Sequence, residues 1–162
     1  MAIVEARLQV NLKGLKRLRQ DLKSGQGVAQ EITKEWEKLY RAFILLRFDV
    51  FSRGGGNWPP LKRSTIKKKG HNRILVDTNF MRKKLETGIR IIEQSGTSAV
   101  IGFVQDDRHP SANLSVAELA TIHDRGLGPP QRKILVAPDL QTIDKSKKAA
   151  RKLMLAALNR AN

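Results

Sequence analysis

The three histidines, His71, His109 and His123, are the side chains whose chemistry is most readily tested from spacing. Two histidines that share a metal ion on a helix stand four residues apart, and no pair here does. His123 is followed by Asp124, but neighbouring residues of a helix point about 100° apart, so these two cannot act as a catalytic pair. A place near the end of a helix favours packing or a favourable dipole interaction for His123.

Carboxylates, phosphate loops and nucleophiles give no stronger sign of an active site. Asp21-Leu22-Lys23 has the acid-x-Lys spacing of some nucleases, but Leu22 belongs to a helical apolar stripe, and chance explains the spacing better. Gly54-Gly55-Gly56 lacks the Gly-Lys-Ser/Thr end of a phosphate loop. The absence of cysteine excludes thiolate metal sites and cysteine nucleophiles. We therefore predict a protein that is not an enzyme and requires no metal or cofactor.

The charge of the chain indicates the kind of partner instead. Its 162 residues include 31 Lys+Arg and 15 Asp+Glu, a formal net charge of +16, which favours nucleic acid, an acidic protein surface or an anionic membrane. No apolar run approaches the roughly 20 residues that span a bilayer, and the first residues lack the pattern of a signal peptide, so we expect a cytoplasmic protein without a membrane partner.

Two runs hold basic residues with almost no acid, the stretch between Asp49 and Asp77 and the C-terminal segment 140–162. Such a run is usually a solvated face, and the other interpretation is a contact surface for DNA phosphates or an acidic partner. The contact residues predicted on the second interpretation are Lys62, Arg63, Lys67, Lys68, Lys69 and Arg73.

Apolar periodicity predicts the elements that position these residues. Period-two alternation predicts a strand at 3–10. Residues that favour strands, on either side of a Ser95-Gly96 turn, predict a hairpin at 88–94 and 97–104, and a short apolar run predicts a strand at 134–137. Apolar stripes and caps predict helices at 12–22, at 28–51 as the core helix, from Asp77 or Thr78 to 87, at 115–125 after a Ser115–Glu118 capping box, and from Pro138-Asp139 to 158. A short basic turn is predicted at 66–69, capped by Ser64 or Thr65. The predicted fold is α+β, with a small mixed or antiparallel sheet of about four strands packed on the core helix and a C-terminal helix.

We predict a single domain over 1–162, with a Gly/Pro-rich basic loop or arm at about 52–76. Three consecutive glycines act as a hinge, and Trp58-Pro59-Pro60 follows them. Two alternatives remain for this segment: the arm reaches a neighbouring subunit, or Trp58 folds back on its own core.

Two blocks of sequence carry a resemblance to a known family. GGGNWPPLKRSTIKKKGHNRILVDTNFMRKKL contains a glycine-rich loop, Trp-x-Pro-Leu, a Thr in a basic turn and Ile-Leu-x-Asp-Thr. ATIHDRGLGPPQRKILVAP contains Ile-His-x-x-Gly and Pro-x-Arg-x-x-Leu. In order and separation the blocks resemble the phage virion morphogenesis family, the tail-completion or neck proteins of Mu-like tailed phages. The family commonly has Gly after its Asp-Thr step; here Asn79 follows, and Asn tolerates a positive φ.

The resemblance implies a structural protein of the phage head–tail junction, similar to neck and tail-terminator proteins. It implies a homo-oligomeric ring, typically hexameric, around a DNA channel, with other neck, portal-adaptor or tail-tube proteins as neighbours. The location implied is the virion, and the host cytoplasm during assembly. The family-motif residues carried over are Thr65, Leu75, Asp77, Thr78, Leu85, Ile122, His123, Gly126 and Leu135.

Trp58, Pro59, Leu61 and Arg132 are the predicted contacts with a neighbouring subunit or partner. Arg132 has no acid within six residues in sequence, so it must find a carboxylate or carbonyl partner elsewhere, in its own subunit or across subunits. We expect Trp58 and Arg132 to matter more to assembly than any histidine. The alternative function is a stand-alone nucleic-acid-binding protein without sequence preference.

Overall fold

The computed structural model describes residues 13–24, 26–95, 98–103, 108–109 and 113–160. The strand predicted at 3–10 lies outside these residues. The described elements, in chain order, are α1 (Lys13–Ser24), α2 (Val28–Ser52), α3 (Arg63–Lys69), α4 (Phe80–Thr87), β1 (Ile89–Ser95), β2 (Ser98–Phe103), α5 (Val116–Arg125) and α6 (Leu140–Arg160).

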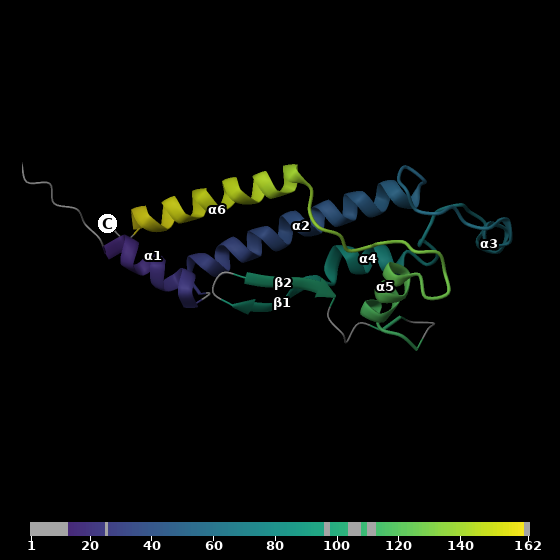
Figure 1. Ribbon diagram of the computed structural model, residues 1–162, viewed down its shortest axis with the longest axis horizontal. Helices are drawn as coiled ribbons and strands as arrows, with labels where there is room; N and C mark the ends of the chain where they lie inside the picture. The colour runs from purple at the N-terminus through teal and green to yellow at the C-terminus, as the bar shows by residue number, and fades with distance from the viewer. Residues whose placement is uncertain (1–12, 25, 96–97, 104–107, 110–112, 161–162) are drawn as a thin grey trace, which may run out of the picture.

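Helix α2 is the axis of the molecule, as the unbroken apolar period predicts. Its 25 residues span about 37 Å at 1.5 Å per residue. Helix α6 packs antiparallel along the N-terminal half of α2, and α1 lies beside both (Figure 1). The hairpin of β1 and β2 and the helices α4 and α5 lie on the other side of α2, while α3 stands at the far end of the molecule from the C-terminus (Figure 1).

The core forms where the second half of α2 meets the loop after it, α4, the hairpin and α5. Phe48, Ile44, Leu85, Ile89 and Ile134 are its largest completely buried side chains. They come from segments far apart in the sequence, so the core ties the central helix to both blocks that carry the family resemblance.

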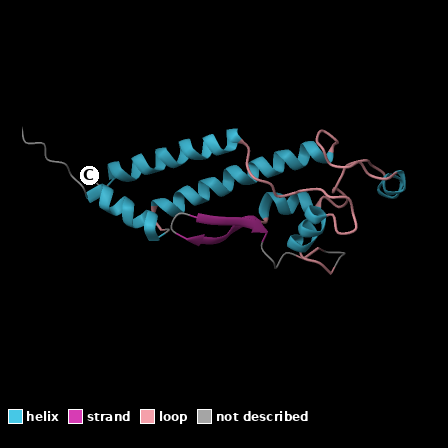
Figure 2. Cartoon of the chain, in the orientation of Figure 1, coloured by secondary structure: helices cyan, strands magenta, loops and turns pink. Residues whose placement is uncertain are grey.

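The prediction of a sheet of about four strands is wrong: the described residues form a mostly helical protein with one antiparallel pair of strands (Figure 2). Side chains of α2 explain why β1 gains no third strand on its outer edge. Glu37 Oε2 accepts a hydrogen bond from Ile91 N at 3.1 Å, and Arg41 donates to the Ile89 carbonyl at 2.9 Å. Arg41 also pairs with Glu37, so both side chains are fixed against the strand.

The apolar segment at 134–137 forms no strand and has a bend at Leu135, which corrects a second predicted element. Side chains take its backbone groups instead. Ile134 N donates to Asp124 Oδ1 at 2.6 Å, and Tyr40 donates its hydroxyl to the Val136 carbonyl at 2.9 Å. Arg47 donates to the Lys133 carbonyl at 2.7 Å.

Several predicted helix ends are confirmed. Ser115 and Glu118 form the capping box, with hydrogen bonds of 3.1 and 2.7 Å, and Gly126 ends α5 at φ 70°. Asp139 Oδ1 accepts from Thr142 N at 2.8 Å, so α6 begins where Pro138-Asp139 predicts.

Two predicted caps are wrong. The residue before α3 is Lys62, in an extended conformation, so neither Ser64 nor Thr65 caps that helix. The residue before α4 is Asn79, with φ 61°, so neither Asp77 nor Thr78 caps it. The tolerance of Asn79 for a positive φ is thereby confirmed.

A side-on ion pair joins α2 to α4. Arg82 donates from Nε and Nη2 to the two oxygens of Asp49, at 2.8 and 3.0 Å. These hydrogen bonds hold the pKa of Asp49 below its ordinary value, against the opposing effect of burial. Both side chains are more than two-thirds buried.

Asp49→Asn is expected to lower the free energy of unfolding by about 1 kcal/mol at pH 7. Because the folded pKa is depressed, the pair stabilises the protein above the unfolded-state pKa of about 3.9, and this stabilisation is lost as the pH falls through the lower folded pKa. Urea unfolding of wild type and variant at pH 7 and pH 3 measures the penalty, which should shrink in acid. Glu86→Gln, at the exposed and longer contact with Arg82, is the control; a penalty for Asp49→Asn that is constant with pH contradicts the assignment.

Candidate functional site

The basic finger, defined as Lys62 with helix α3, is an exposed and positively charged feature of the molecule. None of the residues of α3 is buried, and the helix ends at Gly70, with φ 74°. Figure 1 shows it standing away from the other helices. A short helix that buries no apolar face gains little from packing, so its position favours contact with something outside the chain.

The six predicted contact residues divide into two groups. Lys62, Arg63, Lys67 and Lys68 are exposed, whereas Lys69 and Arg73 are partly buried. Lys69 Nζ donates to the Arg73 carbonyl at 2.9 Å and closes the loop that follows α3. The pKa of Lys69 is lowered, chiefly by burial. The nearby Asp77 opposes this shift, and the positive charge of Arg132 adds to it. Only the four exposed side chains are therefore positioned for an external polyanion.

Trp58 folds back on its own core, which decides between the two alternatives for its segment. It is 6% exposed. Its ring meets Phe48 and Phe51 edge to face, with centroids 5.6 and 5.4 Å away. The Arg47 guanidinium lies 4.2 Å from the Phe51 ring centroid and 5.8 Å from that of Trp58. The indole is thus an anchor of the loop rather than the tip of a free arm.

The three glycines before Trp58 form a tight turn. Gly54 has φ 87°. A Cβ at Gly56 would lie 2.2 Å from the Phe51 ring, so this position requires glycine because the chain passes directly over an aromatic face. The remaining predicted interface residues of this loop, Pro59 and Leu61, are partly buried beside it.

Arg132 is buried at 4% exposure and finds carbonyl partners within its own chain. Its Nη2 donates to the Pro59 carbonyl at 3.0 Å, and its Nη1 lies 3.5 Å from the Pro130 carbonyl oxygen. Burial lowers its pKa. The hydrogen bond to Pro59 joins the two blocks of sequence that carry the family resemblance.

The family-motif residues differ in their burial and backbone conformation in the structure. Leu85 is in the centre of the core, and Gly126 ends α5 in the left-handed conformation. Leu75 shares the positive φ of Asn79, at 55°. Asp77 and Thr78 are exposed, and the members that are partly buried are Thr65, Leu75, Ile122, His123 and Leu135.

His123 and Asp124 do not form a pair in the structure, as the different directions of neighbouring side chains on a helix predict. Burial lowers the pKa of His123, and the nearby Arg132 lowers it further. Asp124 binds the backbone of Ile134 instead of the imidazole. Sequence reasoning missed the role of Asp124, Tyr40 and Arg47 in holding the 133–136 segment. The available signal is an acid near the end of a helix, followed ten residues later by an apolar run.

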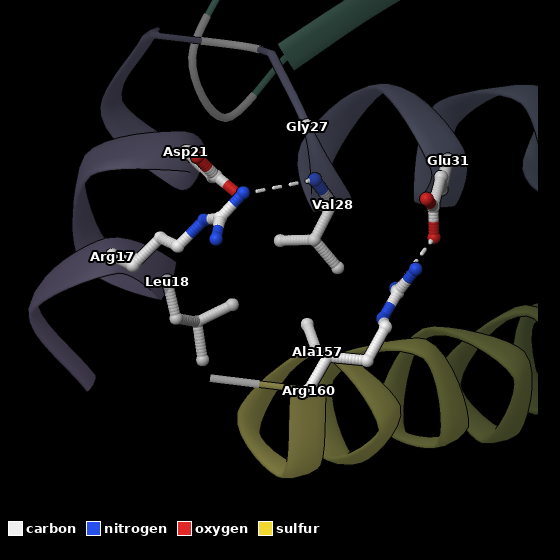
Figure 3. Close-up of a pocket in the computed structure, with 8 residues that line it drawn as sticks. All are labelled: Arg17, Leu18, Asp21, Gly27, Val28, Glu31, Ala157 and Arg160. Carbon is white, nitrogen blue, oxygen red and sulfur yellow. Dashed lines mark hydrogen bonds and ion pairs between the residues drawn. The ribbon is translucent and has the colours of Figure 1, made fainter. Parts of the chain in front are cut away.

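A pocket of about 220 Å³ lies between α1, α2 and α6. Leu18 and Val28 are buried in it. Its acids are already engaged: Asp21 accepts from Val28 N at 3.4 Å, and Arg160 lies 3.4 Å from Glu31. Arg17 and Asp21 point toward one another in Figure 3. The residues around the pocket are Arg17, Leu18, Asp21, Gly27, Val28, Glu31, Ala157 and Arg160.

Among the residues that the structure describes, no helix is long and apolar enough to cross a membrane. In the same part of the chain, no three His, Asp or Glu side chains are grouped closely enough to hold a metal ion. Comparison with protein-family models, curated proteins and solved structures gives no significant match to this chain.

Proposed function

We propose that this chain is a structural protein of a phage virion, one copy of a homo-oligomeric ring at the head–tail junction around a DNA channel. The observation that carries the proposal is the meeting of the two resembling blocks. Trp58, Leu85 and Ile134 share one core, and Arg132 binds the Pro59 carbonyl. Blocks that the sequence separates by dozens of residues thus pack as one unit, as the parts of a single module do.

The basic finger supports the proposed place at a DNA channel. Its four exposed cations stand on, or directly before, a helix in which no residue is fully buried, so they attract phosphate at little cost in stability. No base-reading element is needed, because a channel must pass any sequence. The same cations also suit an acidic neck or tail protein, and the salt dependence of binding to DNA and to such a protein separates these two partners.

The mass of the purified protein in solution tests the ring. The chain is 18.2 kDa, and light scattering is expected to give about six times that mass, increased further when purified tail tubes are added. A monomer at every concentration, with no binding to tail tubes, contradicts the proposal.

The second candidate function is a stand-alone nucleic-acid-binding protein, favoured by the same four exposed cations. A monomeric protein that binds duplex DNA without sequence preference supports this alternative over the ring.

A further inference from the structure

The hairpin of β1 and β2 has two outer edges, and the backbone of β1 shows where the groups of β2 point. Ile91 N and the Ile89 carbonyl both point away from β2, because they bind Glu37 and Arg41 of α2. Opposite residues of an antiparallel pair either exchange both hydrogen bonds or turn both sets of groups outward. Ile101, opposite Ile91, and Phe103, opposite Ile89, therefore turn their N–H and carbonyl groups to the outer edge of β2.

This outer edge of β2 is open among the described residues. Apart from the pairing with β1, none of their hydrogen bonds ends on it. Charged residues, prolines and bulges are the features that protect a free edge from pairing with another strand. The sequence SAVIGF of β2 has no charge and no proline, the bulge of the hairpin lies in β1, and Val100 is 52% exposed. The edge therefore suits an added strand.

The chain contains a segment that matches this edge. Residues 3–10 lie outside the described residues, and their alternation predicts a strand. One of its faces is apolar and the other mostly polar: Val4, Ala6, Leu8 and Val10 against Ile3, Glu5, Arg7 and Gln9. Strand β2 is also two-sided, since Ile101 and Phe103 pack on the core and Val100 is exposed on the other face. An added strand can therefore extend the apolar face of β2 with its own.

The connection to α1 indicates which copy supplies the strand. Only Asn11 and Leu12 separate the segment from Lys13, and this link spans at most about 10 Å. Helix α1 is about 17 Å long, and Figure 1 shows that it begins beside the C-terminus. The hairpin instead lies near the start of α2, where Gln94 donates to Thr33 at 3.2 Å. The link thus begins at the end of α1 remote from the hairpin, which favours β2 of another copy.

We propose that the outer edge of β2 binds residues 3–10 of a second copy of this chain as an added strand. This inference rests on the proposed ring and names a contact that joins its subunits. Main-chain hydrogen bonds supply the affinity of such a contact, and the alternating side chains supply its specificity. Because the N-terminal segment of one copy meets the hairpin of the next, the contact is heterologous, and this kind of contact closes a ring.

Pairs of introduced cysteines test the contact, since the chain has no cysteine of its own. One protein carries Val100→Cys, and it is mixed in turn with Glu5→Cys, Arg7→Cys and Gln9→Cys, which cover the possible registers of one face. We expect one mixture to form disulfide-linked heterodimers in roughly tenfold higher yield than a mixture with Ala6→Cys, on the opposite face. Equal yields from both faces, or no link in any mixture, overturn the added strand.

A double variant then tests which copy supplies the strand. Val100→Cys and the best of the three partner substitutions are placed in one chain and oxidised at low protein concentration. We expect covalent products of two or more chains. A monomer with an internal disulfide assigns the strand to its own hairpin and overturns the second copy.

Matched charges in the segment test the contribution of the strand to assembly. Leu8→Lys and Gln9→Lys each add one positive charge, the first on the apolar face and the second on the polar face. In analytical ultracentrifugation, we expect Leu8→Lys to weaken self-association roughly tenfold and Gln9→Lys to weaken it less than about twofold. Equal effects of the two substitutions overturn the inference.

Ala99→Pro tests the accepting edge. Ala99 precedes Ile101 by two residues, so its N–H also points outward, and proline is tolerated where the N–H faces away from the sheet. We expect the variant to weaken self-association about as much as Leu8→Lys does, with no further loss when the two are combined. If the proline lowers the melting temperature, the comparison of Leu8→Lys with Gln9→Lys decides.

The outcomes separate the inference from the proposed function. Links between copies in a species with the mass of a dimer support the added strand and reject the ring. A ring that forms without such links, and that Leu8→Lys leaves intact, overturns the added strand and keeps the ring. A monomer without links between copies overturns both.

Discussion

Trp58→Ala is expected to lower the free energy of unfolding by about 3–5 kcal/mol. The indole is 6% exposed and packs edge to face on Phe48 and Phe51. Its removal leaves a cavity beside the centre of the core and detaches the loop that leads to α3. Urea unfolding measured by circular dichroism gives the difference.

Two variants serve as controls for Trp58→Ala. Trp58→Phe keeps an aromatic ring in the same place and should lose less than half as much. Leu155→Ala removes an apolar side chain that is 62% exposed on α6, and it should change stability by less than about 0.5 kcal/mol. A loss below about 1 kcal/mol for Trp58→Ala contradicts the position of the indole in the core.

The buried position of Trp58 changes how an assembly assay must be interpreted. The prediction that Trp58 and Arg132 matter more to assembly than any histidine stays a prediction. For Trp58, however, a loss of assembly has a ready cause in the unfolding of the loop. Only a variant that retains the melting temperature of the wild type can report on a direct contact.

Replacing Lys62, Arg63, Lys67 and Lys68 together with Gln is expected to flatten the salt dependence of DNA binding. Each phosphate contact contributes a log–log slope of roughly −0.9, because it releases condensed counter-ions. When salt is raised from about 50 to 200 mM, the wild type loses affinity for DNA. With four contacts removed, the loss in the variant should be smaller by a factor of about a hundred. Fluorescence anisotropy on a short duplex at several salt concentrations measures the slope.

A matched variant separates the basic finger from charge in general. Lys147, Lys148, Arg151 and Lys152 are all exposed on α6, so their replacement by Gln removes the same net charge far from α3. We expect this control to change the slope less than the finger variant does. If both variants give equal slopes, or the finger variant matches the wild type, the finger is not the DNA contact. Weak DNA binding together with salt-sensitive binding to a purified neck or tail protein assigns the finger to an acidic partner.

The elements that the sequence predicts well are those whose pattern is purely local. The apolar period of α2 and the Ser115–Glu118 box depend on residues within a few turns of one another, and both are confirmed. The prediction of a strand at 134–137 is wrong because backbone groups in and beside this segment bind the side chains of Asp124, Tyr40 and Arg47, which lie on two other helices. No apolar pattern within 134–137 carries that information.

In the candidate site, too, the features that depend on local sequence were predicted and those that depend on packing of distant segments were not. Exposure of Lys62, Arg63, Lys67 and Lys68 agrees with the predicted basic surface, but Lys69 lies partly buried against a carbonyl that only the folded loop brings near. The isolation of Arg132 from acids in sequence predicts a distant partner. That the partner is the Pro59 carbonyl, with Nε left empty, depends on packing between the two blocks.

The antiparallel packing of α6 on α2 has a consequence during synthesis on the ribosome. The pair Glu31 and Arg160 joins positions 129 residues apart, so α2 leaves the ribosome long before the helix that covers it. While the residues between the two helices are being made, the apolar face of α2 that α6 covers is open to chaperones or to other nascent chains. The packing of α6 on α2 therefore ends this exposure, and until α6 has been made this face of α2 is open to aggregation.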